Sequence, residues 1–151
     1  DVPCLGIGVL KRKPDIKWQK EEKDIEEISK TQKQILKNCS QYLKKGGKLV
    51  YSTCSILKEE NEDIINEFLE NNKNFEIEKI DLSKNDKIID KEFFKKYQKD
   101  DKYLQVYQND YTDGFFICKL TKNVWKTGKK TIITTILHLY DIYIKNIDFL
   151  L

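Results

Sequence analysis

A cysteine at the end of a short apolar run is the residue in this sequence best suited to chemistry. Cys54 follows the apolar residues 49–51 and lies between the small polar residues Thr53 and Ser55, and the acidic segment 59–62 then opens a helical pattern. This order predicts a strand, a tight loop and a helix, with the thiol at the carboxyl end of the strand. Ligands and reactive groups gather at that edge in open α/β sheets. A thiol near a helix N-terminus can be held partly as thiolate, so we predict that Cys54 is a covalent nucleophile.

The other cysteines define the alternatives for this thiol. They lie at positions 4, 39 and 118, and no two cysteines are two to four residues apart. A zinc knuckle is therefore not predicted, and we expect no metal. The sequence lacks the Cys-x-x-Cys motif that is usual in thiol redox proteins, which argues against that function. A reactive disulfide between Cys4 and Cys54 would favour it. A cysteine that ends a strand is more often a packing residue than a nucleophile, so this pattern alone leaves both interpretations open.

The elements that must position Cys54 follow from periodicity. Residues 22–45 have apolar side chains at three- and four-residue spacing, which predicts a long helix that Gly46 caps. Cys39 falls on this apolar stripe and is predicted to be a small core residue. Residues 48–53 are predicted to form the strand before Cys54. Residues 58–71 are predicted to form a second helix, whose first-turn glutamates complement the helix dipole.

The rest of the chain predicts further strands and an unmatched tail. Residues 75–80, 103–107 and 115–120 are predicted strands, and residues 81–101, rich in Lys, Asp and Asn, are predicted to be a mobile excursion with one short helix. Residues 124–151 change character, and their charged residues argue against a membrane span. This tail is either a docking helix or a frame-shifted read-through, and we favour the second.

Composition bounds the class of protein. The chain has 151 residues, about one domain, and a net charge of +3, which permits a nucleic-acid partner without demanding one. It contains no Met and begins with residues typical of a loop, so we expect a piece of a longer protein. No signal peptide is visible, so we expect reduced thiols in a cytoplasmic protein, and a monomer.

A basic cluster follows the N-terminal loop. Lys11, Arg12 and Lys13 are consecutive, and Gly6 and Gly8 precede them. The cluster is either a solvated surface run or a site of phosphate contact, and the sequence favours neither. The Gly-x-Gly pattern does not follow a visible strand, so it is weak as a dinucleotide fingerprint.

Four segments together resemble one family. Residues 1–8, DVPCLGIG, resemble the Asp-x-Pro-Cys-Ser-Gly-x-Gly motif of the RNA cytosine-C5 methyltransferases, and residues 12–18, RKPDIKW, resemble the segment that follows it in bacterial 16S rRNA enzymes of the Sun or Fmu type. Residues 51–62, with Thr-Cys-Ser and Glu-Asn-Glu, resemble the nucleophile motif, and residues 113–116, DGFF, resemble the terminal strand. The resemblance covers about residues 1–122.

The resemblance implies a fold and a set of roles. The fold would be α/β, with residues 1–123 forming the C-terminal half of a Rossmann-like, S-adenosylmethionine-dependent methyltransferase domain whose cofactor-binding half lies upstream. Cys54 matches the nucleophile, Cys4 matches the cysteine that assists release of the methylated product, and Asp1 matches an acid beside the cofactor. Leu5 stands where the family has Ser. The substrate would be RNA, in particular 16S rRNA, with Lys11, Arg12 and Lys13 as RNA contacts.

Two functions from different classes are compatible with these motifs. The first is cytosine methylation through a Cys54 adduct at carbon 6, because carbon 5 is a poor nucleophile until a thiolate adds to its neighbour. The second is a non-catalytic RNA-binding fragment that uses the basic cluster. The substitution Cys54→Ala separates them, since it would abolish methyl transfer and leave RNA binding intact.

Overall fold

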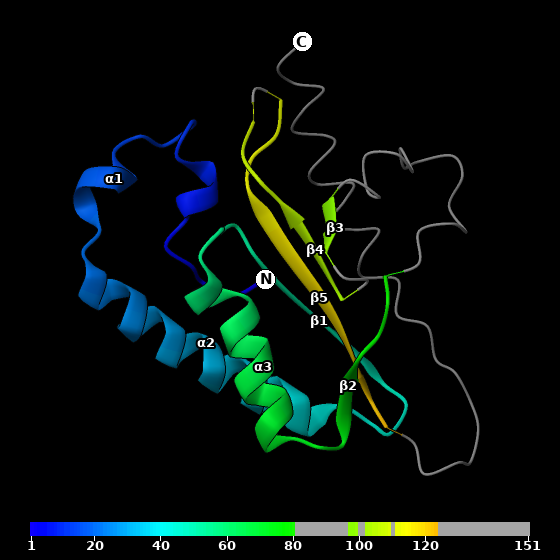
Figure 1. The fold of residues 1–151 in the computed structure, drawn as a ribbon. Helices are drawn as coiled ribbons and strands as arrows, with labels where there is room; N and C mark the ends of the chain where they lie inside the picture. Colours follow the sequence, from blue (N-terminus) through cyan, green and yellow to red (C-terminus); the bar gives the residue numbers. More distant parts are fainter. Residues whose placement is uncertain (81–96, 100–101, 110, 124–151) are drawn as a thin grey trace.

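The computed structural model describes residues 1–80, 97–99, 102–109 and 111–123. The predicted tail, residues 124–151, and nearly all of the predicted excursion, residues 81–101, lie outside the described residues. The N-terminal segment holds two short helices, η1 (Ile7–Val9) and α1 (Ile16–Gln19). The chain then forms a layer of helices that packs against one face of a sheet (Figure 1).

The sheet is built around its last strand. Strand β5 (Phe115–Lys122) pairs antiparallel with β1 (Lys48–Thr53) on one side and with β4 (Tyr103–Val106) on the other. Next to β4 lies β3 (Gln98–Lys99), and β2 (Phe75–Ile77) pairs with the C-terminal end of β5. Because β1 and β4 both run antiparallel to β5, they are parallel to each other.

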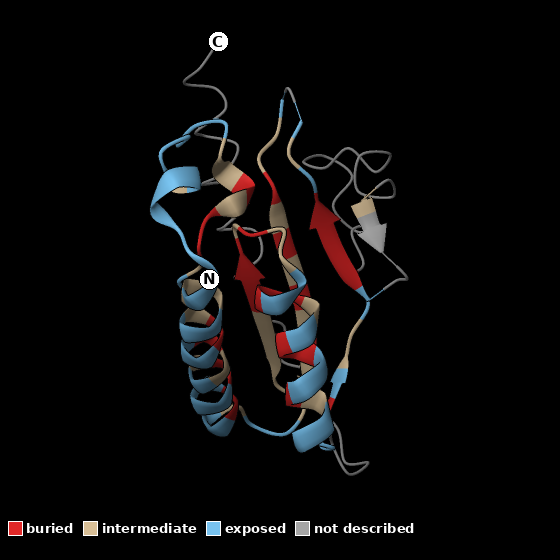
Figure 2. Cartoon of the chain, turned by 60° about the vertical axis from the view of Figure 1, so that its left-hand side comes forward, coloured by how far each residue is buried: buried red, intermediate tan, exposed pale blue. Residues whose placement is uncertain are grey.

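Two helices cover one face of this sheet. Helix α2 (Glu22–Tyr42) and helix α3 (Glu62–Asn71) lie side by side on that face, with α3 preceded by the short helix η2 (Lys58–Glu60). Figure 2 shows that the buried residues of both helices face the sheet, while the outer turns are exposed. The main core joins side chains of these helices to β1 and β5, and its most deeply buried members are Tyr51, Ile64, Ile65, Phe116, Cys118 and Leu120.

Strand β5 separates two apolar clusters because its side chains alternate between the two faces of the sheet. Phe116, Cys118 and Leu120 are buried under the helices. Phe115 and Ile117 point to the opposite face and pack against a smaller cluster of Ile80, Leu104 and Val106. This alternation is typical of a central strand with both faces covered.

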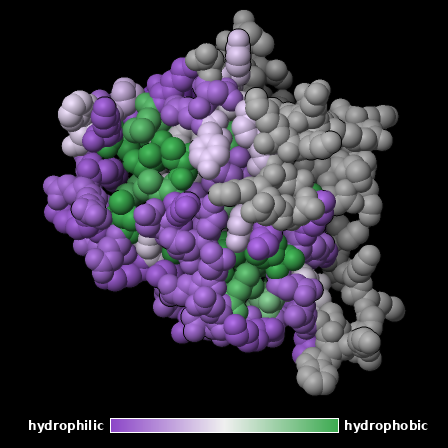
Figure 3. Space-filling view, in the orientation of Figure 1, coloured by the Kyte–Doolittle hydropathy of each residue, from purple (hydrophilic) through white to green (hydrophobic). Residues whose placement is uncertain are grey.

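The surface seen in Figure 3 is mainly hydrophilic where the residues are described, with hydrophobic areas, in green, at two places.

The structure corrects the sequence-based helix boundaries. Helix α2 ends at Tyr42, and Leu43 is already extended, so the predicted end at residue 45 is wrong. Gly46 instead forms the turn into β1, with a positive φ of 73° that suits glycine. The predicted helix over residues 58–71 is divided at Asn61, whose φ of −118° and ψ of −98° interrupt the helical path.

Cys39 is not a core residue. It is exposed, so the prediction that it is a small core residue is wrong, and Tyr42 on the same helix is 88% exposed. The stripe of α2 that faces the sheet consists of Ser29, Gln32, Leu36 and Ser40, at three- and four-residue spacing. Polar residues therefore occupy much of the buried face, while the apolar residue Leu36 lies in the core, as the predicted apolar stripe requires. No helix in the described residues is both long and apolar enough to cross a bilayer.

Candidate active site

Two thiols meet where β1 ends. Cys54 directly follows β1, and its sulfur lies 2.8 Å from the sulfur of Cys4, which belongs to the N-terminal segment. Both cysteines are partly buried and neither is in a disulfide. The sequence predicted a reactive Cys54, and the structure adds a second thiol in direct contact with it.

Backbone hydrogen bonds bring the N-terminal segment to this position. The N–H of Val2 donates to the carbonyl of Ser52 at 3.1 Å, and the N–H of Gly8 donates to the carbonyl of Cys54 at 2.9 Å. A side chain at position 8 would meet that carbonyl, since a β-carbon there would lie 2.6 Å from the oxygen of Cys54. Glycine is therefore required at position 8 for the two loops to approach each other.

A third loop closes the site from the other side. The N–H of Gly114 donates to the carbonyl of Gly8 at 2.7 Å. The guanidinium of Arg12 forms an ion pair with the carboxylate of Asp113, the residue before Gly114. Arg12 of the predicted basic cluster is thereby held beside the loop between β4 and β5.

The thiol contact makes the two cysteines chemically different. The hydrogen bond from Cys4 is the largest influence on Cys54 and lowers its pKa to about 7, although burial acts in the opposite direction. The charge of Lys13 also lowers the pKa of Cys54, whereas the charge of Glu60 raises it. The same hydrogen bond, together with burial, raises the pKa of Cys4 well above that of an ordinary thiol. The opposite directions of the two pKa shifts therefore favour the thiolate at Cys54 and the proton at Cys4.

Cys118 shows what burial without a partner does to a thiol. Its side chain is fully buried in the core beneath α2 and α3. Burial alone raises its pKa to about 12. It is therefore a packing residue, whereas at Cys54 the hydrogen bond with Cys4 is the largest influence and lowers the pKa.

A buried polar network supports the loop that carries Cys54. The hydroxyl of Thr53 donates to the side-chain oxygen of Asn61 at 2.6 Å, and the amide of Asn61 donates to the carbonyl of Ser55 at 2.9 Å. The hydroxyl of Ser55 donates to the carboxylate of Glu60 at 2.5 Å. Each of these residues is fully buried. The loop around Cys54 is thus held on both sides by side chains from η2 and the start of α3.

The sequence pattern does not predict this network. It predicts Glu60 only as a first-turn residue that complements the helix dipole, and Asn61 only as part of the Glu-Asn-Glu segment. Both side chains are 0% exposed. Their signal in the sequence is weak, because an acidic residue near a helix start is common at exposed positions as well.

The remaining predicted site residues lie around the thiol pair. Asp1 is exposed at the carboxyl end of β1, where the hydroxyl of Ser52 donates to its carboxylate at 3.4 Å. Lys13 is close enough to Cys54 to lower its pKa. The structure therefore brings Asp1, Cys4, Cys54 and Lys13 to one end of the sheet. In the described part of the chain, no three His, Cys, Asp or Glu side chains are grouped as a metal site requires.

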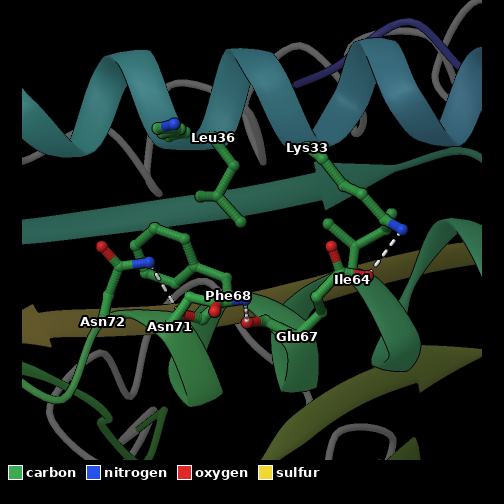
Figure 4. Close-up of a pocket in the computed structure, with 8 residues that line it drawn as sticks. Lys33, Leu36, Ile64, Glu67, Phe68, Asn71 and Asn72 are labelled. Carbon is green, nitrogen blue, oxygen red and sulfur yellow. Dashed lines mark hydrogen bonds and ion pairs between the residues drawn. The ribbon is translucent and has the colours of Figure 1, made fainter.

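A cavity of about 370 Å³ lies elsewhere, between α2 and α3. Leu36, Ile64 and Phe68 form its apolar side, and Lys33 pairs with Glu67 at 2.6 Å across its mouth (Figure 4). Residues of α2 and α3 line it together with Asn72, and neither Cys4 nor Cys54 is among them. Its lining has no group suited to catalysis beyond this exposed ion pair, so we attribute it to helix packing.

The fold and the site together define a class of protein. The helix-covered sheet, with an antiparallel last strand between β1 and β4 and reactive groups at the end of β1, is part of an α/β, Rossmann-like methyltransferase domain. A family model described as 16S rRNA methyltransferase RsmB/F matches residues 1–121. The chain belongs to this family.

Individual relatives agree with the family. The chain is 54% identical over 69 residues to ribosomal RNA small subunit methyltransferase B of Shewanella oneidensis, a match that covers 46% of the chain and 16% of that protein. It is 38% identical over 123 residues to the probable ribosomal RNA small subunit methyltransferase B of Bacillus subtilis, which covers 81% of the chain and 26% of that protein. The chain thus spans 16% and 26% of the length of these two relatives.

Solved structures show the same fold. The structure described as PH0851 superposes with a TM-score of 0.65 and 29% identity, covering 81% of the chain and 25% of that structure. NSun6 from Pyrococcus horikoshii, solved with SFG, superposes with a TM-score of 0.60 and 27% identity, covering 81% of the chain and 28% of that structure.

Proposed function

We propose that this chain carries the nucleophile of an enzyme that methylates carbon 5 of cytosine in 16S rRNA. The observation that carries the proposal is the pair of thiols at 2.8 Å, of which Cys54 has a pKa of about 7. A nucleophile with a pKa near the working pH combines a useful thiolate fraction with good intrinsic reactivity. Family membership supports an rRNA substrate, because the model that matches residues 1–121 is that of 16S rRNA methyltransferases.

The proposed chemistry uses Cys54 first as a nucleophile and then as a leaving group. The thiolate adds to carbon 6 of cytosine, forming a carbon–sulfur bond and placing electron density on carbon 5, which can then accept a methyl group. A base removes the carbon-5 proton, the electron pair restores the ring double bond, and the carbon–sulfur bond breaks to return the thiolate. Covalent catalysis of this kind divides one difficult step into easier ones.

Cys4 is proposed to assist the release of the product. Its raised pKa keeps a proton on its sulfur, next to the sulfur of Cys54. That proton stabilises the thiolate of Cys54, so Cys4 makes Cys54 a better leaving group when the carbon–sulfur bond breaks.

The cofactor we propose is S-adenosylmethionine, and one residue of this chain, Asp1, is suited to bind it. The carboxylate of Asp1 is exposed at the carboxyl end of β1, where an acidic group suits the hydroxyl and ammonium groups of this cofactor. The relative solved with SFG, an S-adenosylmethionine analogue, supports the choice. When bound, the cofactor would supply an activated methyl group, and Asp1 is the residue of this chain that would contact it.

We propose that the target cytosine lies in single-stranded or looped RNA. A base must leave its stack to reach a partly buried thiol, and unpaired RNA lowers the cost of this step. Lys11, Arg12 and Lys13 are the proposed phosphate contacts beside the thiol pair. The ion pair of Arg12 with Asp113 would position its guanidinium at the rim of the site.

We further propose that the protein acts in the cytoplasm as a monomer.

Trapping the covalent adduct tests this function. The chain, joined to the upstream part of a family member, is mixed with an rRNA fragment that carries 5-azacytosine at the target position and S-adenosylmethionine. We expect a protein–RNA adduct that survives a denaturing gel, is absent with Cys54→Ala and persists with Cys4→Ala. Cys39→Ala, which changes an exposed thiol, is the matched control and should give the adduct at an unchanged level.

Two other outcomes would overturn parts of the proposal. An adduct lost only with Cys4→Ala would exchange the roles of the two cysteines. RNA binding without an adduct from any form would favour a non-catalytic RNA-binding module. The exposed Trp18, 83% exposed on α1 next to the basic cluster, is the observation that favours this second function, because exposed aromatic side chains can stack on bases.

A further inference from the structure

The side chain of Glu60 lies behind the two loops that carry the cysteines. It is 0% exposed. One carboxylate oxygen accepts a hydrogen bond from the backbone N–H of Leu5 at 3.0 Å, and the other accepts from the hydroxyl of Ser55 at 2.5 Å. One carboxylate therefore contacts the residue after Cys4 and the residue after Cys54.

We propose that Glu60 is a positioning residue that holds the two cysteine loops together and thereby sets the contact between Cys4 and Cys54. As a contributor to the methyl transfer, this inference rests on the proposed function. As a statement about the thiol pair, it can be tested on the chain without RNA or cofactor.

Gln32 of α2 provides the second half of the same arrangement. Its side-chain amide donates to the carboxylate of Glu60 at 2.9 Å and also to the carbonyl of Pro3 at 2.9 Å. The carbonyl before Cys4 and the N–H after it are therefore both fixed, one by Gln32 and the other by Glu60. Gln32 is 0% exposed, so this connection is protected from water.

A role in packing alone does not explain a carboxylate at this position. Burying an ionised group is costly unless hydrogen bonds compensate for it, and an apolar residue of similar volume would fill the space without that cost. Glu60 has three donors, from Leu5, Gln32 and Ser55, and its backbone carbonyl accepts a further hydrogen bond from the hydroxyl of Tyr51 at 2.6 Å. All three donors to the carboxylate, the backbone N–H of Leu5 and the side chains of Gln32 and Ser55, lie on the cysteine loops or on α2, which packs against them.

The charge of Glu60 and its positioning role affect Cys54 in opposite directions, which makes the proposal testable. The groups that act on Cys54 are Cys4 from the N-terminal segment, Lys13 after η1 and Glu60 from η2. The negative charge of Glu60 raises the pKa of Cys54, so removal of the charge alone would lower that pKa. Loss of positioning would weaken the hydrogen bond from Cys4, which is the largest influence, and would raise the pKa.

The decisive variant is Glu60→Gln. The new amide group keeps the size of the side chain but replaces one acceptor oxygen by an NH2 group. Either the hydrogen bonds from Leu5 and Gln32 are lost, or the bond with Ser55 is reversed, and every remaining bond loses the charge that strengthens it. The rate of Cys54 alkylation by iodoacetamide is measured against pH on the intact chain, and the modified cysteine is identified by peptide mass spectrometry. We expect the midpoint to rise toward about 8.5, the value of an ordinary thiol, and the rate at pH 7 to fall about tenfold.

The matched control is Glu59→Gln, which changes an exposed neighbouring glutamate and should leave the profile unchanged. A midpoint for Glu60→Gln that falls would show that Glu60 acts through its charge, and would overturn the proposal. A lower melting temperature with an unchanged midpoint would show a purely structural role, and would overturn it as well.

A second variant decides the matter if Glu60→Gln does not give a folded chain by circular dichroism. Gln32→Leu removes the amide that connects Glu60 to Pro3 and adds no charge. The same criterion applies, since a raised midpoint supports the proposal and an unchanged one overturns it. Because the measurement needs no RNA, failure of the adduct experiment would leave this result intact, and failure here would leave the assignment of the nucleophile intact.

Discussion

The sulfur atoms of Cys4 and Cys54 lie 2.8 Å apart, although 50 positions separate the two residues in the chain. The contact exists because three loops pair through their backbones, with Gly8 between Cys54 and Gly114. Its consequence is an unequal pair, in which the pKa of Cys54 is lowered to about 7 and that of Cys4 is raised. Two similar thiols are thereby given different chemical roles by geometry.

Removal of Cys4 should make Cys54 a more ordinary thiol. The variant Cys4→Ala removes the hydrogen bond that is the main cause of the lowered pKa of Cys54. Without this hydrogen bond the thiolate of Cys54 is less stable, so a higher pH is needed to ionise the thiol. We expect the alkylation midpoint to rise from about 7 toward about 8.5 in the variant. The pH profile of iodoacetamide alkylation at Cys54 measures this change. Cys39→Ala is the control, and an equal midpoint in Cys4→Ala and wild type would contradict the geometry.

Enlarging Gly8 should separate the loops of the site. A β-carbon at this position would lie 2.6 Å from the carbonyl oxygen of Cys54, a backbone atom that cannot rotate away. We expect Gly8→Ala to lower the free energy of unfolding by about 2–3 kcal/mol, as overpacking does in tight interiors. Urea denaturation followed by circular dichroism measures the change. Gly6→Ala is the comparison, because a β-carbon there meets only side-chain atoms, at 3.2 Å and 3.6 Å, and adds strain from a φ of 72°. A larger loss for Gly6→Ala than for Gly8→Ala would be inconsistent with the close approach of the loops.

The hydrogen bond between Thr53 and Asn61 should contribute to stability. Thr53→Val keeps the shape of the side chain but leaves the buried oxygen of Asn61 without its donor at 2.6 Å. We expect a loss of about 1–3 kcal/mol in the free energy of unfolding, because the unpaired acceptor cannot reach water. The matched control is Thr31→Val on the exposed side of α2, where the change should stay within about 0.5 kcal/mol. Equal midpoints for both variants in urea would argue against the buried network.

The interface between α2 and α3 should depend on its apolar contacts and little on its ion pair. Leu36 is 3% exposed and belongs to the main core, so Leu36→Ala should lower the free energy of unfolding by about 2–5 kcal/mol. Lys33 and Glu67 are 41% and 50% exposed, so Lys33→Met should cost about 1 kcal/mol or less. Thermal denaturation of both variants, with the exposed Tyr42→Ala as a neutral reference, measures the difference. An ion-pair variant less stable than Leu36→Ala would refute this account of the interface.

Local pattern was sufficient for much of the fold. The strand over residues 48–53 was predicted with the bounds that β1 has, because a short apolar run between a Gly-Gly break and small polar residues has few other solutions. The strands that became β4 and β5 were placed to within two residues of their ends. Three boundaries failed: the helix end at residues 43–45, the break at Asn61, and the strand predicted over residues 75–80, which ends at Ile77. These ends depend on backbone conformations that sequence periodicity does not specify.

The order of the chain determined which residues could react, and only the tertiary structure decided how they differ. Cys54 could be singled out from its position after a strand, and its family motif pointed to Cys4 as well. The unequal acidity of the pair depends on a contact of 2.8 Å that long-range packing creates. The same holds for Glu60, which is an ordinary acidic residue at a helix start in the sequence. It becomes a buried acceptor for Leu5, Gln32 and Ser55 only because α2 and the N-terminal loop pack against η2, and such packing leaves no local signal.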